Sequence, residues 1–275
     1  MTRLFLSLAL GACAAATATP ASGQTRPGFD VGLEVFQIGY KEFAEGDLFI
    51  RQDGRMVGIN LSFVQPIAAG LFGRALLSGA SGSVDYDPLD EAVVEDIGQS
   101  SGRLELHLGY DFLLKGGASI TPFAGFGVRV YEDESGGRQT EAGLLGYDRE
   151  VAYRYIPVGL AASIPVGGRT RINLSGQYNH LIGGEVNNLF SRIDPEAPDV
   201  KLGFNGGHGL EASAMLSLPV GRRHAINVGP FIRRWELNES ESLTLVNPDD
   251  PDESVTLLEP GNRTTEVGLR VSFSF

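Results

Sequence analysis

A strict two-residue alternation of apolar and polar side chains constrains this chain more than any other feature. In the segment 103–114, one parity holds Leu104, Leu106, Leu108, Tyr110, Phe112 and Leu114, and the other holds Arg103, Glu105, His107, Gly109 and Asp111. Successive side chains of a β-strand point to opposite faces, so this segment predicts a strand with one apolar face and one charged face. The same alternation recurs at 57–63, 172–178, 210–218 and 266–275.

Five segments with weaker alternation bring the expected number of strands to ten. They cover about 29–42, 71–81, 120–131, 151–164 and 225–237. Short connections at 65–70, 115–119, 165–169 and 219–224 alternate with long ones near 43–54, 82–101, 132–150, 181–207 and 238–263. Short turns on one side and long loops on the other are typical of a transmembrane barrel, whereas the Greek-key connections of a soluble sandwich impose no such order. The sequence therefore predicts an all-β fold, a single antiparallel ten-stranded up-and-down transmembrane β-barrel with both termini on the short-turn side.

The two ends of the chain indicate a route to the outer membrane of a Gram-negative cell. Arg3, the apolar run 4–10 and the small residues up to Gly23 predict a signal peptide over 1–23, which leaves 24–275 as the barrel domain. Lipidation of Cys13, which follows a lipobox-like Leu-Gly-Ala, is the alternative. The last strand resembles the C-terminal signal that the barrel-assembly machinery reads during insertion, and its alternating apolar residues are Val267, Leu269, Val271, Phe273 and Phe275.

Charge is divided between the loops and the barrel. The formal net charge is -12, and the four longest loops together hold 23 acidic and 5 basic residues. Acidic loops exclude a nucleic-acid partner, whose binding surface would be basic. We expect outer-membrane lipid and lipopolysaccharide as partners, and we expect divalent cations to be attracted to these loops. The acidic run 247–253 is the densest, but it lacks the ligand spacing of an EF-hand, which favours a solvated loop over a defined calcium site.

The polar parity of the strands carries charges of both signs into the expected lumen. The residues expected to form this charge network are Glu34, Arg74, Arg103, Glu105, Arg129, Arg233, Glu266 and Arg270. A ten-stranded barrel is only somewhat wider than an eight-stranded one, whose interior the side chains just fill. The charges could therefore pair across the lumen as a plug, which is the favoured interpretation, or they could line a path for ions.

Neither catalytic residues nor a cofactor site is expected from the sequence. The single cysteine and four histidines show no metal-ligand spacing, and no nucleophile motif is present. Omptin-type proteases are also ten-stranded barrels and use acidic pairs with an Asp-x-His element at the outer rim. Here Asp85 and Asp87 could imitate such a pair, but Gly206 stands two residues before His208 where the acid would be. Lipid-modifying barrels use a rim histidine with a partner, and His180 has no evident partner.

Several sequence segments resemble those of a family of uncharacterised bacterial outer-membrane β-barrel proteins. They are Pro122-Phe123-Ala124-Gly125-Phe126-Gly127-Val128-Arg129, Gly146-Tyr147-Asp148-Arg149 with Tyr153 and Tyr155, Pro230-Phe231 with Trp235, and 259–266. The broader likeness is to porin-like and autotransporter-type small barrels, and it implies a barrel and its location without an activity. The aromatic residues of these segments are expected in the lumen or in an interfacial girdle. The expected function is a non-enzymatic envelope protein that displays its loops; the alternatives are a small porin-like channel and a rim-sited hydrolase.

Overall fold

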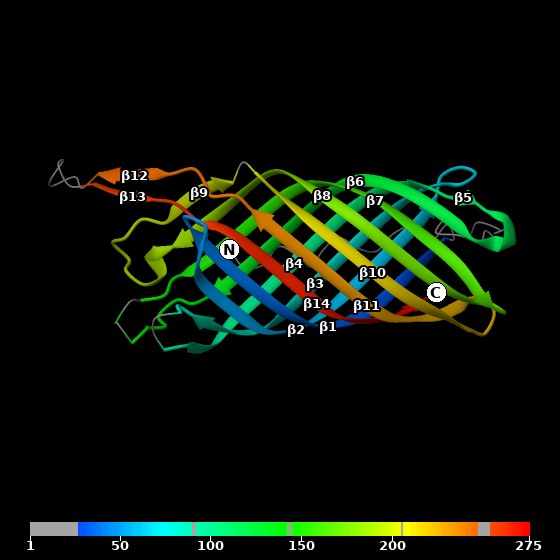
Figure 1. Cartoon of the computed structure of the whole chain (residues 1–275), viewed down its shortest axis with the longest axis horizontal. Coiled ribbons are helices and arrows are strands. Elements are labelled where there is room, and N and C mark those ends of the chain that lie inside the picture. Colours follow the sequence, from blue (N-terminus) through cyan, green and yellow to red (C-terminus); the bar gives the residue numbers. More distant parts are fainter. Residues whose placement is uncertain (1–26, 90–91, 142, 144, 205, 247–253) are drawn as a thin grey trace.

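The chain folds into a closed antiparallel β-barrel (Figure 1). The computed structural model describes residues 27–89, 92–141, 143, 145–204, 206–246 and 254–275. The barrel strands are β1 (Gly28–Ala44), β2 (Asp47–Pro66), β3 (Leu71–Asp87), β4 (Val94–Tyr110), β6 (Ser119–Glu134), β7 (Asp148–Gly167), β8 (Thr170–Leu189), β10 (Gly207–Val220), β11 (His224–Leu237) and β14 (Gly261–Ser274). The shorter elements are β5 (Phe112–Leu113), β9 (Val200–Phe204), β12 (Leu243–Val246), β13 (Ser254–Leu257) and two three-residue 3₁₀ turns, η1 (Lys115–Gly117) and η2 (Phe190–Arg192).

Pairing between the first and last strands closes the barrel. β14 runs antiparallel to β1 in the register Asp30↔Ser274, and the backbone N–H of Phe275 donates to the carbonyl of Phe29 at 2.9 Å. The other barrel strands pair with their neighbours in the chain, and β8 pairs directly with β10. Closure leaves the barrel without a free edge strand. The predicted ten-stranded up-and-down topology is confirmed.

An apolar belt surrounds the outside of the barrel. The alternation places Leu33, Leu106 and Leu269 on the outer face, where they are 60%, 53% and 60% exposed. Contiguous apolar surface on this scale is rare on soluble proteins and matches the hydrocarbon core of a bilayer. No described helix is long and apolar enough to span a membrane.

The strands continue well beyond this belt, so several segments expected as loops are strand. Residues 43–54 form the ends of β1 and β2, joined by a turn in which Glu45 and Gly46 have φ of 53° and 93°. The alternation persists there. Polar residues such as Lys41 and Asp53 face outward, and the residues between them, such as Gln52, face inward and are buried. The apolar parity ends with the belt, and polar side chains cover the outer face of these extensions, so the sequence predicted loops there.

The two ends of the barrel differ. At the long-loop end, η2 and β9 lie between β8 and β10, and the β12–β13 hairpin projects farthest from the barrel (Figure 1). At the short-turn end, β7 and β8 are joined by Gly168 and Arg169, and β10 and β11 are joined by 221–223. The end of β14 also lies at the short-turn end (Figure 1). The expected signal peptide, Cys13 and the acidic run 247–253 lie outside the described residues.

Candidate functional site

A network of buried ion pairs crosses the middle of the lumen, and we call it the ion-pair layer. It contains four arginines and four carboxylates: Arg103, Arg129, Arg233, Arg270, Glu34, Glu105, Glu211 and Glu266. Seven of the eight residues expected to form the charge network lie in this layer. The exception, Arg74, lies closer to the short-turn end, where its guanidinium sits 5.2 Å from the centre of the Phe72 ring.

Arg233 is the centre of the layer. Its guanidinium donates to Glu34 Oε2 at 2.7 Å and to Glu266 Oε2 at 2.8 Å. Each of these carboxylates is shared with a second arginine, Glu266 with Arg129 and Glu34 with Arg270. Arg233 also lies 4.2 Å from the centre of the Phe231 ring, which adds a cation–π contact. The equal number of opposite charges allows the layer to be buried, because an unpaired charge there would be costly.

Glu105 extends the layer toward β4 and β7. Its Oε1 accepts a hydrogen bond of 2.7 Å from the Tyr155 hydroxyl, and its Oε2 lies 3.0 Å from His107 Nε2. Arg103 joins Glu105 to Glu211. Glu211, whose polar parity within 210–218 also predicts a side chain facing the lumen, completes the charge balance of the layer.

Packed side chains fill the lumen on the long-loop side of the layer. One cluster centres on Trp235, whose ring centre lies 4.9 Å from that of Tyr155 at 70°, with Tyr153, Leu181 and Phe204 around them. A second cluster consists mainly of Phe36, Ile38, Met56, Val84, Ile97, Tyr131 and Phe231. Trp235 is 3% exposed, which places it in the lumen and excludes it from the interfacial girdle.

Glycines on the inner face make room for these rings. A Cβ on Gly127 would lie 2.3 Å from atoms of the Tyr155 ring, and one on Gly209 would lie 2.8 Å from the Trp235 indole. Such separations are far below van der Waals contact, so only glycine fits opposite each ring. Part of the high glycine content is therefore explained by the packing of the lumen.

A second charged cluster, the mouth cluster, lies at the long-loop end. The Arg149 guanidinium lies 2.8 Å from Glu42 Oε1, 3.1 Å from Glu259 Oε1 and 3.5 Å from Asp133 Oδ2. Burial raises the pKa of Glu259 to about 7; Arg149 opposes this shift, and the neighbouring carboxylates Glu42 and Asp133 add to it. The Tyr40 hydroxyl donates to Glu42 Oε1 at 2.7 Å. Glu259 thereby ties the segment that follows the β12–β13 hairpin to the barrel wall.

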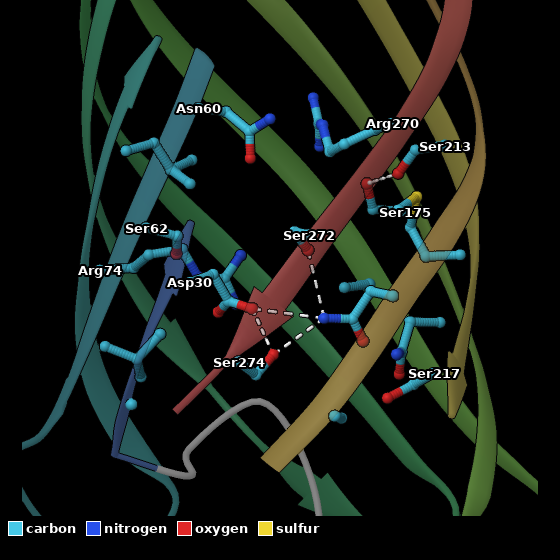
Figure 2. A pocket seen from close by; sticks show the side chains of 18 of the residues that line it. Asp30, Asn60, Ser62, Arg74, Ser175, Ser213, Ser217, Arg270, Ser272 and Ser274 are labelled. Carbon is cyan, nitrogen blue, oxygen red and sulfur yellow. Dashed lines mark hydrogen bonds between the residues drawn. The ribbon is translucent and has the colours of Figure 1, made fainter. Parts of the chain in front are cut away.

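On the short-turn side of the layer lies a cavity of about 630 Å³, the vestibule (Figure 2). Its wall is rich in hydroxyl and amide groups, and Figure 2 shows Ser62, Ser217 and Ser274 among them. The Asn227 amide donates to Ser274 Oγ at 2.8 Å and to Asp30 Oδ1 at 3.3 Å. Arg103, Glu105, Glu211 and Arg270 of the ion-pair layer form its inner end. Two further cavities, one within the ion-pair layer and one beside the mouth cluster, measure about 20 and 10 Å³, the room that a single water molecule needs.

The rim residues that could imitate a catalytic site do not face the lumen. His208 lies opposite His180 on the outer face of the wall, and its ring stacks on Tyr178 with centres 5.9 Å apart. Asp87 is paired with Arg51 at 2.9 Å. Within the described part of the chain, no group of three or more His, Cys, Asp or Glu side chains could hold a metal ion.

The expected insertion signal lies on the outer face of β14. Val267, Leu269 and Val271 are exposed to the belt, and Phe273 stacks against His224 with ring centres 5.5 Å apart. Phe275 follows the last paired residue and is exposed. The arrangement leaves these side chains accessible, while recognition by the assembly machinery stays a prediction.

Comparison with solved structures identifies the fold. The outer membrane protease OmpT from Escherichia coli matches with a TM-score of 0.60 at 9% identity, over 90% of this chain and 97% of that chain. An outer membrane channel from Pseudomonas putida (TM-score 0.41, 12% identity, 94% and 100% covered) and the translocator domain of the autotransporter NalP from Neisseria meningitidis (TM-score 0.39, 10% identity, 90% and 90% covered) are more distant. No family model and no curated protein sequence matches the chain. The chain has the fold of an outer-membrane β-barrel.

Proposed function

We propose that this chain is a non-enzymatic integral protein of the Gram-negative outer membrane. Its closed barrel anchors the chain in the membrane and displays the extended strands and the β12–β13 hairpin of the long-loop end. The observation that carries the proposal is the filled lumen. The ion-pair layer crosses it, and the Trp235 and Phe36 clusters pack behind that layer. A lumen blocked in this way leaves the extended strands and the β12–β13 hairpin as the parts that can meet other molecules.

The proposed orientation follows from the apolar belt and the distribution of charge. The belt contacts lipid, the acidic long-loop end faces outward, and both termini lie in the periplasm with the short turns. Lipopolysaccharide surrounds the outer half of the barrel, and divalent cations collect at the acidic loops. The barrel-assembly machinery inserts the chain by reading the outward-facing residues of β14.

The first experiment is single-channel conductance of the refolded barrel, with closure verified by its heat-modifiable migration on gels. We expect a silent barrel, because four buried arginines and four carboxylates would have to separate before an ion could pass. Stable conductance steps that shift in the Arg103→Glu variant would overturn the closed-anchor proposal and favour a small channel, the second candidate, which the vestibule supports.

A deletion tests the display role. Replacing 243–257 with a short Gly-Ser linker removes the β12–β13 hairpin and leaves the ten barrel strands intact. We expect a folded barrel with impaired envelope integrity or impaired surface binding. A deletion strain with unchanged integrity and unchanged binding would contradict display by this hairpin.

A rim hydrolase is the third candidate, supported by the fold shared with the protease OmpT. Its strongest remaining observation is the His180–His208 pair on adjacent strands. Hydrolysis of a peptide or lipid substrate that disappears in both His180→Ala and His208→Ala variants would favour it over the anchor. We expect no such activity, since Tyr178 stacks on His208 and no acidic side chain of the described residues is bonded to either ring.

A further inference from the structure

The vestibule has the size, the polarity and the charge of a ligand site. Its volume of about 630 Å³ lies within the ~300–1,000 Å³ typical of small-molecule pockets. It is closed at its inner end by the ion-pair layer and opens at the short-turn end, near Arg169 and Arg223. A ligand could therefore enter from one side only and would be enclosed by the barrel wall.

The lining has an excess of positive charge. Among the described lining residues there are six arginines and three carboxylates. The inner arginines are matched, since Arg103 pairs with Glu211 and Arg270 pairs with Glu34. Toward the short-turn opening of the vestibule, Arg169 and Arg171 are bonded to neutral groups instead.

Arg171 and Arg169 contribute to this excess of positive charge. Arg171 donates to Ser163 Oγ at 2.7 Å and to the Gly117 carbonyl at 2.8 Å, and Arg169 donates to the carbonyls of Gly221 and Arg222. Neither guanidinium forms an ion pair with a carboxylate of the described chain. A guanidinium held by neutral acceptors keeps its full charge and has donors left over, which suits carboxylate or phosphate oxygens.

The rest of the wall offers hydrogen bonds suited to hydroxyl groups. Ser175 and Ser213 face each other across adjacent strands with their Oγ atoms 3.2 Å apart, and Ser217 lies four residues farther along β10 on the same face (Figure 2). The Nδ2 of Asn60, which also lines the vestibule, is buried without a hydrogen-bond partner. A buried amide without a partner is unfavourable unless a ligand or water satisfies it.

From these observations we infer that the vestibule binds a small polyhydroxylated anion, a sugar phosphate or sugar acid, with its charged group at Arg169 and Arg171 and its hydroxyls against the serine and amide wall. This site goes beyond the proposed display function and lies at the opposite end of the barrel. A silent barrel can bind such a ligand, so the conductance and binding results stand separately.

Calorimetric titration of the purified barrel in detergent tests the inference, with glucose 6-phosphate, glucose and inorganic phosphate as probes. We expect glucose 6-phosphate to bind most tightly, because only this probe offers both the charge and the hydroxyls. The Arg171→Gln variant should weaken its binding by about tenfold or more, the usual scale for one charge-assisted hydrogen bond. The affinity of the Arg171→Lys variant, which keeps the charge but lacks the planar guanidinium, should lie between those of the wild-type protein and Arg171→Gln.

Arg222→Gln is the matched control, since Arg222 is exposed on the neighbouring turn and does not line the vestibule. Heat-modifiable migration verifies that each variant is folded, and Arg169→Gln replaces Arg171→Gln should the latter fail to fold. Equal losses in Arg171→Gln and Arg222→Gln would show general charge attraction and overturn the site. Absent binding of glucose 6-phosphate, or equal affinity for inorganic phosphate, would also overturn it.

Discussion

Replacing Glu266 by glutamine removes the charge that two buried arginines share. The Glu266 side chain is 2% exposed and bonds to Arg129 and to Arg233, the latter at 2.8 Å. Glutamine keeps the volume, so no cavity forms, but Arg129 loses its carboxylate partner and Arg233 keeps only Glu34 and, at 3.6 Å, Glu211. Removing one partner of a buried ion pair costs about 3–5 kcal/mol, because the remaining charge stays desolvated. We expect the free energy of unfolding to fall by about that amount.

The chain contains its own matched control. Glu236 also bonds to two arginines, Arg234 and Arg263, but its side chain is 31% exposed on the outer face. Exposed pairs contribute about 0–1 kcal/mol, so Glu236→Gln should change the unfolding free energy by no more than that.

Urea unfolding of the refolded barrel provides the assay for both variants. Trp235 is the single tryptophan, lies buried in the lumen, and should report unfolding by its fluorescence. The comparison requires reversible transitions and equal dependence on denaturant, so that a shift in midpoint reports stability. Equal, small losses in Glu266→Gln and Glu236→Gln would refute the argument that the ion-pair layer is a desolvated network that stabilises the barrel.

Three further changes test other parts of the lumen. The pKa of Glu259 is raised from 4.5 to about 7, so the folded barrel binds the proton more tightly than the unfolded chain does. The resulting contribution to stability is complete below pH 4.5 and is lost as the pH rises through 7; it amounts to at most about 3 kcal/mol. The backbone N–H of Ser240 donates to the Glu259 carbonyl at 3.0 Å, so hydrogen exchange of this amide should show easier opening of the segment at pH 8 than at pH 6. Glu259→Gln should abolish this dependence, and opening that is independent of pH in the wild-type protein would contradict the argument. Gly127→Val should destabilise the barrel by about 1–3 kcal/mol in urea because its side chain would overlap the Tyr155 ring; an unchanged midpoint would show that the ring can move. Tyr155→Phe should cost about 1 kcal/mol in the same assay by removing the hydroxyl that donates to Glu105, and a neutral result would mean that another donor replaces it.

The strand number and topology could be predicted because both depend on local order in the chain. A period of two reports which face of a strand each side chain occupies, and the order of long and short connections reports the side on which each lies. This information was sufficient for the ten strands and for most of the inward-facing charges, Arg103 and Glu266 among them. It was insufficient beyond the belt, where polar residues cover both faces and the ends of β1 and β2 resemble loops.

The pairing of charges depends on the tilt and closure of the barrel. Arg129 and Glu266 are 137 residues apart in the chain, and Arg233 and Glu34 are 199 apart, yet each pair is in hydrogen-bond contact. Parity indicates that these side chains point inward, but the stagger between strands sets their height along the axis, and a local pattern does not contain that stagger. The same geometry places Trp235 in the lumen. Alternation along the chain thus specified the wall of this barrel, whereas the closed lumen and the vestibule exist only because folding brings distant strands to a common height.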